Sequence, residues 1–431
     1  MTRFDVVVVG GGPAGLAAGA VLARGGRTVA VLERGSCDQL RVGETLGPEV
    51  GPLLRALGAW DDLCAVLSHQ VPFTEVSSAW GSPALSERPS VQHPLGEGWH
   101  VDRSLFDRAL AAWAARTGVD VRFDAGSCTV AREGGGFLVR PRRGEAVWGQ
   151  QLVDASGRGA PGSSALGRWL AHDRQVGLLG RFEGPPGSGL LLEAVAEGFW
   201  YVGPQPDGTL IAALVTDADL VPRDRQHFLA SLARTRHTAR WLDGRSLLGE
   251  VHAFRSDSGR LLPDRGDGWC AVGDAAMATD PLGGNGVARA FQSALGVALA
   301  LSEPWDGRAA SRRFSDYMDL RATYYIMEGR WPDAPFWARR RPAHPDGSPL
   351  EWRQVDLALP PETLLAWVGD PGPAAEAWLP PAALDALRKA LAGPLPAHVA
   401  LTRVREAAPI GDQRLLAGLQ WLLAAGVLAP R

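Results

Sequence analysis

The start of the chain reads as a strand, a glycine-rich turn, a helix and a second strand in immediate succession. FDVVVVG (residues 4–10) is a β-branched run ending in glycine, which predicts a parallel strand buried on both faces. An alanine- and leucine-rich helix is expected from about Pro13 to Arg24, and TVAVLE (28–33) predicts the next strand. Because parallel neighbours need a crossover helix, this βαβ unit predicts an α/β fold built on a parallel sheet.

The glycines in this unit have the spacing of a dinucleotide-binding turn. Gly10, Gly12 and Gly15 form GxGxxG directly after the strand, and Glu33 ends the second strand. The first two glycines permit a tight turn and a close approach to a pyrophosphate, the third allows helix–strand packing, and a carboxylate at Glu33 can bind ribose hydroxyls. A glycine turn without a ligand is the alternative. The motif alone does not choose between FAD and NAD.

A second group of motifs, far downstream, distinguishes between FAD and NAD. Residues 270–274 (CAVGD) predict an apolar strand ending in Gly-Asp, and 280–286 (DPLGGNG) predict a glycine-rich loop before a helix. Here the sequence resembles the FAD-dependent monooxygenases of the hydroxybenzoate-hydroxylase and halogenase superfamily. Two further stretches, WHVDR (99–103) and DASGR (154–158), also resemble this superfamily, and all the matching stretches follow one another along the chain in the order that the superfamily has. The resemblance spans about residues 4–300.

That resemblance implies FAD as the cofactor and assigns its contacts. Asp274 is expected at the ribityl chain, Arg103 at FAD, and the loop after Asp280 along the isoalloxazine ring. The implied cofactor-binding set is Gly10, Gly12, Ala14, Gly15, Glu33, Arg34, Arg41, Arg103, Asp274, Pro281, Gly283, Gly284, Asn285 and Gly286. Only one fingerprint of this kind is present, so NADH or NADPH is expected as a transient reductant, with a separate flavin reductase as the alternative.

The fold class expected is α/β: a Rossmann-type FAD-binding domain, an interleaved antiparallel β-sheet substrate domain and a small, mainly helical C-terminal module. A helix capped by Ser104 and closed by Gly118 is expected within the FAD-binding part. In the C-terminal part, helical spacing covers residues 381–391, about 399–407 and 412–425, and GVLAP (426–430) predicts a short strand. The boundaries we expect are FAD-binding segments at 1–72, 103–165 and 263–330, substrate-domain segments at 73–102 and 166–262, and a connector with a winged-helix-like module at 331–431.

Further stretches indicate which branch of the superfamily the chain resembles, and the branch indicates whether halogenation or oxygenation is expected. RVGETLGP (41–48), SAWG (78–81) and FWYVGP (199–204) resemble tryptophan halogenases and their monooxygenase relatives. Halogenases of this kind use a lysine in the first half of the chain and a WxWxIP stretch; here the only lysine is Lys389 and the aromatic stretch reads FWYVGP. The resemblance therefore implies oxygenation with O2 through a flavin hydroperoxide rather than halogenation. Asp280 and Glu44 are the candidate acid–base residues, with orientation of the flavin loop and an FAD or surface contact as their respective alternatives.

A narrower resemblance concerns the substrate. SAWG, GWHVDR (98–103), FWYVGPQPDG (199–208) and TDADL (216–220) are similar to the flavoprotein monooxygenases of tryptophylquinone biogenesis, notably those of quinohemoprotein amine dehydrogenase maturation. The resemblance implies a tryptophan in a partner polypeptide as the substrate, with Trp80 and Trp200 as candidate substrate-pocket residues. A small-molecule aromatic hydroxylase, a reductase of the geranylgeranyl-reductase type and a non-enzymatic flavin-bound partner protein stay open as alternatives.

Composition excludes several other classes. The formal net charge of -3 gives no reason to expect a nucleic-acid partner. The four cysteines, Cys37, Cys64, Cys128 and Cys270, form no CxxC pair, so neither a metal site nor a disulfide framework is suggested. No apolar run has the length of a membrane span, and the first strand begins at once without a signal peptide, so a cytoplasmic protein without a membrane partner is expected.

Overall fold

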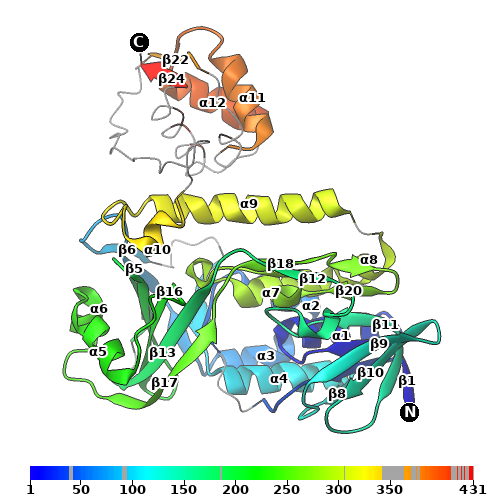
Figure 1. The fold of residues 1–431 in the computed structure, drawn as a ribbon. Helices are drawn as coiled ribbons and strands as arrows, with labels where there is room; N and C mark the ends of the chain where they lie inside the picture. The colour runs from blue at the N-terminus through cyan, green and yellow to red at the C-terminus, as the bar shows by residue number, and fades with distance from the viewer. Residues whose placement is uncertain are drawn as a thin grey trace. The chain divides into compact units, whose positions relative to one another are not determined.

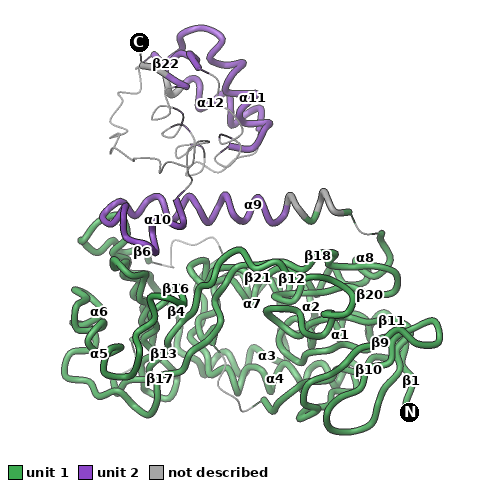
Figure 2. The backbone as a smooth tube through the Cα atoms, viewed as in Figure 1, with its two compact units in different colours: residues 1–310 green, residues 311–431 purple. Residues whose placement is uncertain are grey.

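The chain folds into two compact units, which we describe separately from a computed structural model. Unit 1 comprises residues 1–310 and unit 2 residues 311–431 (Figure 2). The structure describes residues 1–37, 42–89, 95–184, 187–304, 306–341, 364–369, 375, 379–408, 415, 419, 422 and 427–430. Within these residues no helix is long and apolar enough to cross a membrane.

Unit 1 is built on an eight-stranded sheet whose central strands are parallel. The strand order is β19-β20-β11-β1-β2-β8, and a hairpin of β9 and β10 extends it from β11. The bounds are β1 Thr2–Val9, β2 Val29–Leu32, β8 Asp120–Arg122, β9 Cys128–Glu133, β10 Gly136–Pro141, β11 Val147–Asp154, β19 Arg265–Gly266 and β20 Trp269–Ala271. In β1, Val6 and Val8 join one hydrophobic cluster while Val7 and Val9 join another, because alternate side chains enter opposite faces. The expected strand buried on both faces is confirmed.

Helices cover the face of this sheet that Val6 and Val8 enter. Helix α1 lies against α4 and α7, and it supplies buried alanines and leucines to the same cluster. The bounds are α1 Pro13–Arg24, α2 Val50–Leu57, α3 Trp60–Leu67, α4 Arg103–Arg116, α7 Gly286–Leu295 and α8 Val297–Ser302. The expected cap of α4 was wrong: Asp102, not Ser104, is the N-cap, since its carboxylate accepts from the amides of Ser104 and Leu105 at 2.8 and 3.2 Å. Asp102 has the extended backbone that an N-cap requires, whereas Ser104 already lies in the first turn.

A second, seven-stranded sheet holds the segments expected for the substrate domain. Its order is β17-β13-β16-β15-β14-β5-β6, antiparallel except for the parallel pair of β14 and β5. The bounds are β5 Glu75–Ala79, β6 Ser86–Pro89, β13 Gln175–Glu183, β14 Gly189–Val195, β15 Gly198–Pro204, β16 Thr209–Asp217 and β17 Leu247–Arg255. Helices α5 (Arg225–Ala233) and α6 (His237–Trp241) cover the face turned away from the first sheet (Figure 1). The opposite face receives Val42, from the chain that follows β2.

Shorter elements connect the two sheets. Two three-stranded sheets of unit 1 have the orders β3-β7-β4 and β12-β18-β21, and three single turns of 3₁₀ helix are found among the described residues of this unit. The bounds are β3 Thr45–Leu46, β4 Val71–Phe73, β7 Gly98–His100, β12 Arg168–Ala171, β18 Gly259–Leu262, β21 Met277–Ala278, η2 Pro161–Ser163, η3 Gly273–Ala275 and η4 Pro281–Gly283. The chain enters the first sheet, leaves for the second and returns, so the expected fold class, with an interleaved antiparallel sheet, is confirmed. The exact domain boundaries stay predictions.

Unit 2 has its own hydrophobic cluster. Leu365, Leu387 and Val404 are buried together there, on one strand and two helices. The bounds are α9 Gly307–Ile326, where the unit begins, α10 Pro335–Ala338, β22 Leu364–Trp367, α11 Pro381–Ala390, β23 Leu395–Pro396, α12 Ala397–Ala407 and β24 Leu428–Pro430. Two of the expected helices and the final strand are present; the helix expected at 412–425 falls largely outside the described residues. The likeness to a winged helix stays a prediction.

Candidate FAD and substrate site

The glycine turn after β1 has no room for side chains. Gly10 has a φ of +110°, and a Cβ atom there would lie 2.2 Å from the carbonyl oxygen of Ala155, at the end of the neighbouring strand β11. A Cβ atom on Gly15 would lie 1.9 Å from the carbonyl oxygen of Gly10. Helix α1 then begins at Pro13 without a side-chain cap, so its first turn can bind an anion through backbone amides. Gly12, as N-cap, and Ala14, in the first turn, lie where the sequence placed them.

Glu33 lies beside this turn. One carboxylate oxygen accepts a hydrogen bond from the amide of Gly11 at 2.5 Å, and the other lies 3.4 Å from the amide of Gly35. The carboxylate thus marks the end of β2 next to the start of α1, the position from which an acidic residue reaches a ribose in dinucleotide-binding folds. Arg34 is exposed beside it. Arg41 lies outside the described residues.

The downstream motif packs directly onto the first one. Gly273 has a φ of +58°, and a Cβ atom there would lie 2.7 Å from the Cβ atom of Ala14. This contact brings Asp274 to the start of α1, although the two segments are far apart in sequence. The Asp274 side chain is 36% exposed and lies 3.4 Å from Nε of Arg158. Desolvation raises the pKa of this carboxyl, and the nearby arginines Arg158 and Arg289 oppose the shift.

Arg158, in the DASGR stretch, lies at the candidate site beside Asp274. Its guanidinium donates to the carbonyl oxygens of Asp257 at 2.5 Å and Thr279 at 2.8 Å, besides its ion pair with Asp274. These contacts tie the segment 274–280 to the end of β17. A guanidinium with several donors in a fixed plane is suited to such a junction.

The loop that begins at Asp280 leads to the N-terminus of α7, which has no side-chain cap. Asp280 is buried, and its two oxygens accept from the amide of Leu282 at 2.9 Å and from Nε2 of Gln175 at 3.0 Å. Residues 283–286 are exposed, and α7 begins there without a side-chain cap. The first amides of α7 and its positive dipole end therefore face outward beside Pro281, an arrangement that favours a group carrying partial negative charge. Gln175 was missed because nothing in the sequence links it to a loop 105 residues away.

The guanidinium of Arg103 donates its hydrogen bonds to neighbouring groups of the protein. Its guanidinium pairs with Asp107 at 3.1 Å, and Nη1 donates to the carbonyl oxygen of Val42 at 2.5 Å. Both side chains of the ion pair are buried, at 9% and 1% exposed. The structure thus gives Arg103 a role in holding the chain at Val42 and Gly43, just before Glu44; its expected contact with FAD stays a prediction.

Glu44 is a buried carboxyl with one unpartnered oxygen. The side chain is 5% exposed; Oε2 accepts from the amide of Gly43 at 2.9 Å, while Oε1 has no hydrogen-bond partner among the described residues. Burial raises the pKa of Glu44, and Arg103 opposes this rise. Burial also raises the pKa of Tyr201, and the charge of Glu44 adds to the rise.

The two predicted pocket tryptophans lie on different faces of the second sheet. Trp200 packs on Phe228 of α5 with ring centroids 5.0 Å apart, so its neighbour Tyr201 points to the face that meets Val42. Trp80 contacts Phe199, at a centroid distance of 5.7 Å, and Phe199 alternates with Trp200 in the same strand. The structure therefore brings Trp80, but not Trp200, to the side of the sheet on which Glu44 lies.

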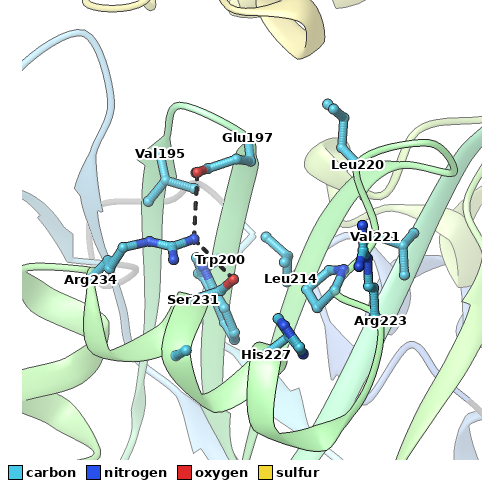
Figure 3. Close-up of a pocket in the computed structure, with 12 residues that line it drawn as sticks. Val195, Glu197, Trp200, Leu214, Leu220, Val221, Arg223, His227, Ser231 and Arg234 are labelled. Atoms are coloured by element: carbon cyan, nitrogen blue, oxygen red, sulfur yellow. Dashed lines mark hydrogen bonds and ion pairs between the residues drawn. The ribbon is translucent and has the colours of Figure 1, made fainter.

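Trp200 instead borders a pocket under α5. The pocket has a volume of about 300 Å³, and its rim carries Arg234, which lies 3.6 Å from Glu197 and donates to Ser231 (Figure 3). Its apolar side is formed by Leu214 and by the chain that follows β16. This pocket is separated from Tyr201 by the sheet itself.

The residues around the first site fit FAD. They comprise a glycine turn too tight for any Cβ, two uncapped helix starts, and carboxylates at the two positions expected for ribose and ribityl hydroxyls. Among the described residues, no group of histidine, cysteine or acidic side chains could hold a metal ion. The donors therefore suit a dinucleotide with an anionic pyrophosphate.

Comparison with known proteins agrees with this geometry. Residues 3–155 match the family described as FAD binding domain. A putative FAD-dependent oxidoreductase, LodB of Marinomonas mediterranea, is 28% identical over 374 residues, covering 79% of this chain and 97% of the relative. The solved structure of a peptidyl tryptophan dihydroxylase essential for tryptophylquinone cofactor biogenesis is 26% identical, with a TM-score of 0.64, and the match covers 99% of this chain and 100% of that one.

Halogenases share the fold as well. The myxobacterial chondrochloren halogenase is 25% identical with a TM-score of 0.68, over 79% of this chain and 86% of the halogenase. These findings confirm the expected resemblance to the FAD-dependent monooxygenases and halogenases. The chain contains an FAD-binding domain and has the fold of that group of flavin enzymes.

Proposed function

We propose that this protein is an FAD-dependent monooxygenase that hydroxylates the ring of a tryptophan in a partner polypeptide during tryptophylquinone biogenesis. The observation that carries the proposal is the end-to-end likeness to a peptidyl tryptophan dihydroxylase, which includes the C-terminal unit. A flavin-dependent halogenase, at 21% identity, also covers the whole chain, so the likeness to the dihydroxylase supports the proposal through its 26% identity rather than through coverage alone. The stretches of sequence that resemble the tryptophylquinone flavoproteins point to the same substrate.

FAD, when bound, would supply the activation of O2 for transfer of one oxygen atom. The amides of α1 after Gly10 would hold the pyrophosphate, Glu33 a ribose, Asp274 the ribityl chain, and the start of α7 the carbonyl end of the isoalloxazine ring. In the overall reaction an aromatic C–H, O2, a proton and NADH or NADPH yield a C–OH, water and the oxidised nicotinamide. The reductant acts directly or through a separate flavin reductase.

The chain's own residues would exclude water and manage a proton. Asp280 has both oxygens occupied by neighbours, which favours a role in orienting the loop at 281–286. Glu44 has a raised pKa, a free oxygen and little exposure, which favours a role in holding a proton. Of the two candidate acid–base residues, Glu44 is thus the better placed for proton transfer.

The position of the lysine argues against halogenation. Lys389 lies on α11 in unit 2, is 76% exposed and pairs with Asp385 at 2.7 Å. A carrier of hypohalous acid would have to lie within the FAD-binding unit, and that unit contains no lysine. The absence of this lysine favours oxygenation over halogenation for the same flavin.

The decisive experiment is intact mass spectrometry of a tryptophan-containing candidate polypeptide after aerobic incubation with the protein, FAD and NADH or NADPH. A gain of one or two oxygen atoms that disappears without O2, and no gain of chlorine when chloride is added, is the expected result. Hydroxylation of free small aromatics without any change in polypeptide mass would replace the proposal with a small-molecule hydroxylase. Reduction of a substrate double bond without O2 would replace it with a reductase.

A further inference from the structure

The pocket under α5 lies on the face of the second sheet that is turned away from the first sheet (Figure 1). Its volume of about 300 Å³ is at the lower end of the range for small-ligand pockets. The larger apolar residues that line it are Val195, Trp200, Leu214, Leu220, Val221 and Pro222. Trp200 is 1% exposed and packs on Phe228, so the core beneath holds this apolar lining in place. The pocket therefore offers a preformed surface for an apolar group of small-molecule size.

The rim of the pocket carries more positive than negative charge. Arg234 and Arg223 come from opposite sides of the pocket, and Glu197 is the one carboxylate among the described residues that line it (Figure 3). The ion pair of Arg234 with Glu197 spans 3.6 Å, and the two side chains are 64% and 49% exposed. Such an exposed pair contributes little stability, so an incoming anion can compete with Glu197 for the guanidinium.

The chain around the pocket adds to this positive charge. Residues 220–245, which include α5 and α6, contain six arginines and two aspartates, in a chain whose formal net charge is -3. Arg236 and Arg240 are exposed beside the two arginines of the rim. Charge of one sign that gathers around a concave surface raises the local concentration of ions of the opposite sign. The pocket is therefore expected to select an anion.

We propose that this pocket is a second ligand site, which binds a small molecule with a carboxylate on an apolar chain. The carboxylate lies between Arg223 and Arg234, and the chain lies on the apolar lining beside Leu214. A guanidinium suits this task because its planar fork of N–H donors matches the two oxygens of a carboxylate. An ammonium group in the same place would face two guanidinium groups, so the site discriminates by charge. The sheet separates the pocket from the Glu44 segment, so the inference does not depend on the proposed function.

The first test compares two probes of equal chain length and opposite charge, octanoate and octylamine. Calorimetric titration of the full chain loaded with FAD should show saturable binding of octanoate. Octylamine is expected to bind more weakly by roughly tenfold or more, because its charge is repelled at the rim. Neither probe has an aromatic ring, which keeps the measurement apart from any site for an aromatic substrate.

A pair of alanine substitutions on α5 tests the location. Ala230 lines the pocket, so Ala230→Phe places a ring inside it and should weaken octanoate binding by roughly tenfold or more. Ala233 is exposed on the same helix and is not among the lining residues. Ala233→Phe is therefore the matched control and should bind octanoate like the wild type.

Three substitutions test the role of charge. Arg234→Gln should weaken octanoate binding by roughly tenfold, because a hydrogen bond to a charged group is lost. Arg240→Gln, at an exposed arginine of α6 outside the lining, should leave the affinity unchanged. Glu197→Gln removes the carboxylate that competes for Arg234 and should tighten the binding.

Each outcome of these titrations decides the inference. Thermal melting and flavin absorbance establish that the variants are folded and loaded with FAD. The inference is overturned if octanoate shows no saturable binding, if octylamine binds equally well, or if Ala230→Phe keeps the affinity of the wild type. Should Ala230→Phe fail to fold, equal affinities of Arg234→Gln and Arg240→Gln overturn it instead. Hydroxylation of a polypeptide enters none of these measurements, so the proposed function and this inference can fail separately.

Discussion

At the scale of single residues, Glu44 makes the stability of the protein depend on pH. Because burial raises its pKa in the folded state, the unfolded chain ionises at lower pH than the folded one. The free energy of unfolding therefore falls as pH rises from the ordinary carboxyl pKa through the raised one, by about 1.4 kcal/mol for each tenfold difference in acid dissociation constant between the two states. Glu44→Gln removes this loss. We expect the free energy of unfolding of Glu44→Gln to equal that of the wild type near pH 4 and to exceed it at pH 8.

Denaturant titrations at several pH values, with wild type and variant side by side, measure this difference. Burial lowers the pKa of His100 to about 4. The stability that the neutral imidazole contributes to the folded state is therefore lost as pH falls from about 6.5 to about 4. The effect of His100 is common to both proteins and cancels in the comparison. A variant that is less stable than the wild type at pH 8 would mean that the Glu44 carboxylate is stabilised by contacts that the structure does not contain.

Several residue-level assignments could not be read from the sequence. Strand alternation indicates that Trp200 and Tyr201 face opposite sides, but the choice of inner face depends on where α5 packs, which is a tertiary fact. The cap of α4 was misassigned because Asp102 and Ser104 are both good capping residues and only the backbone conformation distinguishes them. Glycine spacing, by contrast, located the turn directly, since a side chain at Gly10 or Gly15 would clash with backbone atoms.

At the scale of elements, the hydrogen bond between Gln175 and Asp280 joins β13 to η4. Gln175 is 1% exposed, so Gln175→Leu leaves Oδ2 of Asp280 buried without this donor, at a cost of about 1–3 kcal/mol. The loop that begins α7 would lose its anchor to the second sheet. We expect weaker FAD binding, by roughly tenfold, and a changed flavin absorbance spectrum in the variant.

Fluorescence titration of the apoprotein with FAD measures this loss. Gln226→Leu, at an exposed position of α5, is the matched control and should bind FAD like the wild type. Equal FAD affinity in Gln175→Leu and the control would show that η4 holds its position without the link to β13.

The elements themselves were largely predictable, while their junctions were not. Runs of apolar residues, and the glycines at their ends, are local signals. They predicted the strands and helices from β1 to α1 and from β20 to α7. The contacts that build the site join residues far apart in the chain: Ala14 to Gly273, Gln175 to Asp280, and Arg158 to the end of β17. A single sequence carries no local trace of such pairs, so only the family resemblance anticipated that the two glycine motifs meet.

At the scale of the whole molecule, the two units have separate hydrophobic clusters, and all described FAD-site residues lie in unit 1. A ligand that binds only the folded state stabilises the unit that holds it, by about 2.7 kcal/mol at a concentration roughly one hundred times its dissociation constant. In the proposed site FAD would join segments of unit 1 that are distant in sequence, so its removal should lower the melting temperature of that unit. Unit 2 should melt at a temperature that does not respond to FAD.

Differential scanning calorimetry of the full chain with and without FAD tests this. Two transitions are expected, and only one should move with the FAD concentration. Lys389→Ala, which removes the exposed ion pair with Asp385 on α11, changes unit 2 alone and should leave the FAD-dependent transition in place. A single transition that moves as a whole would mean that the two cores unfold together, and the C-terminal unit would then be coupled to the flavin site in stability.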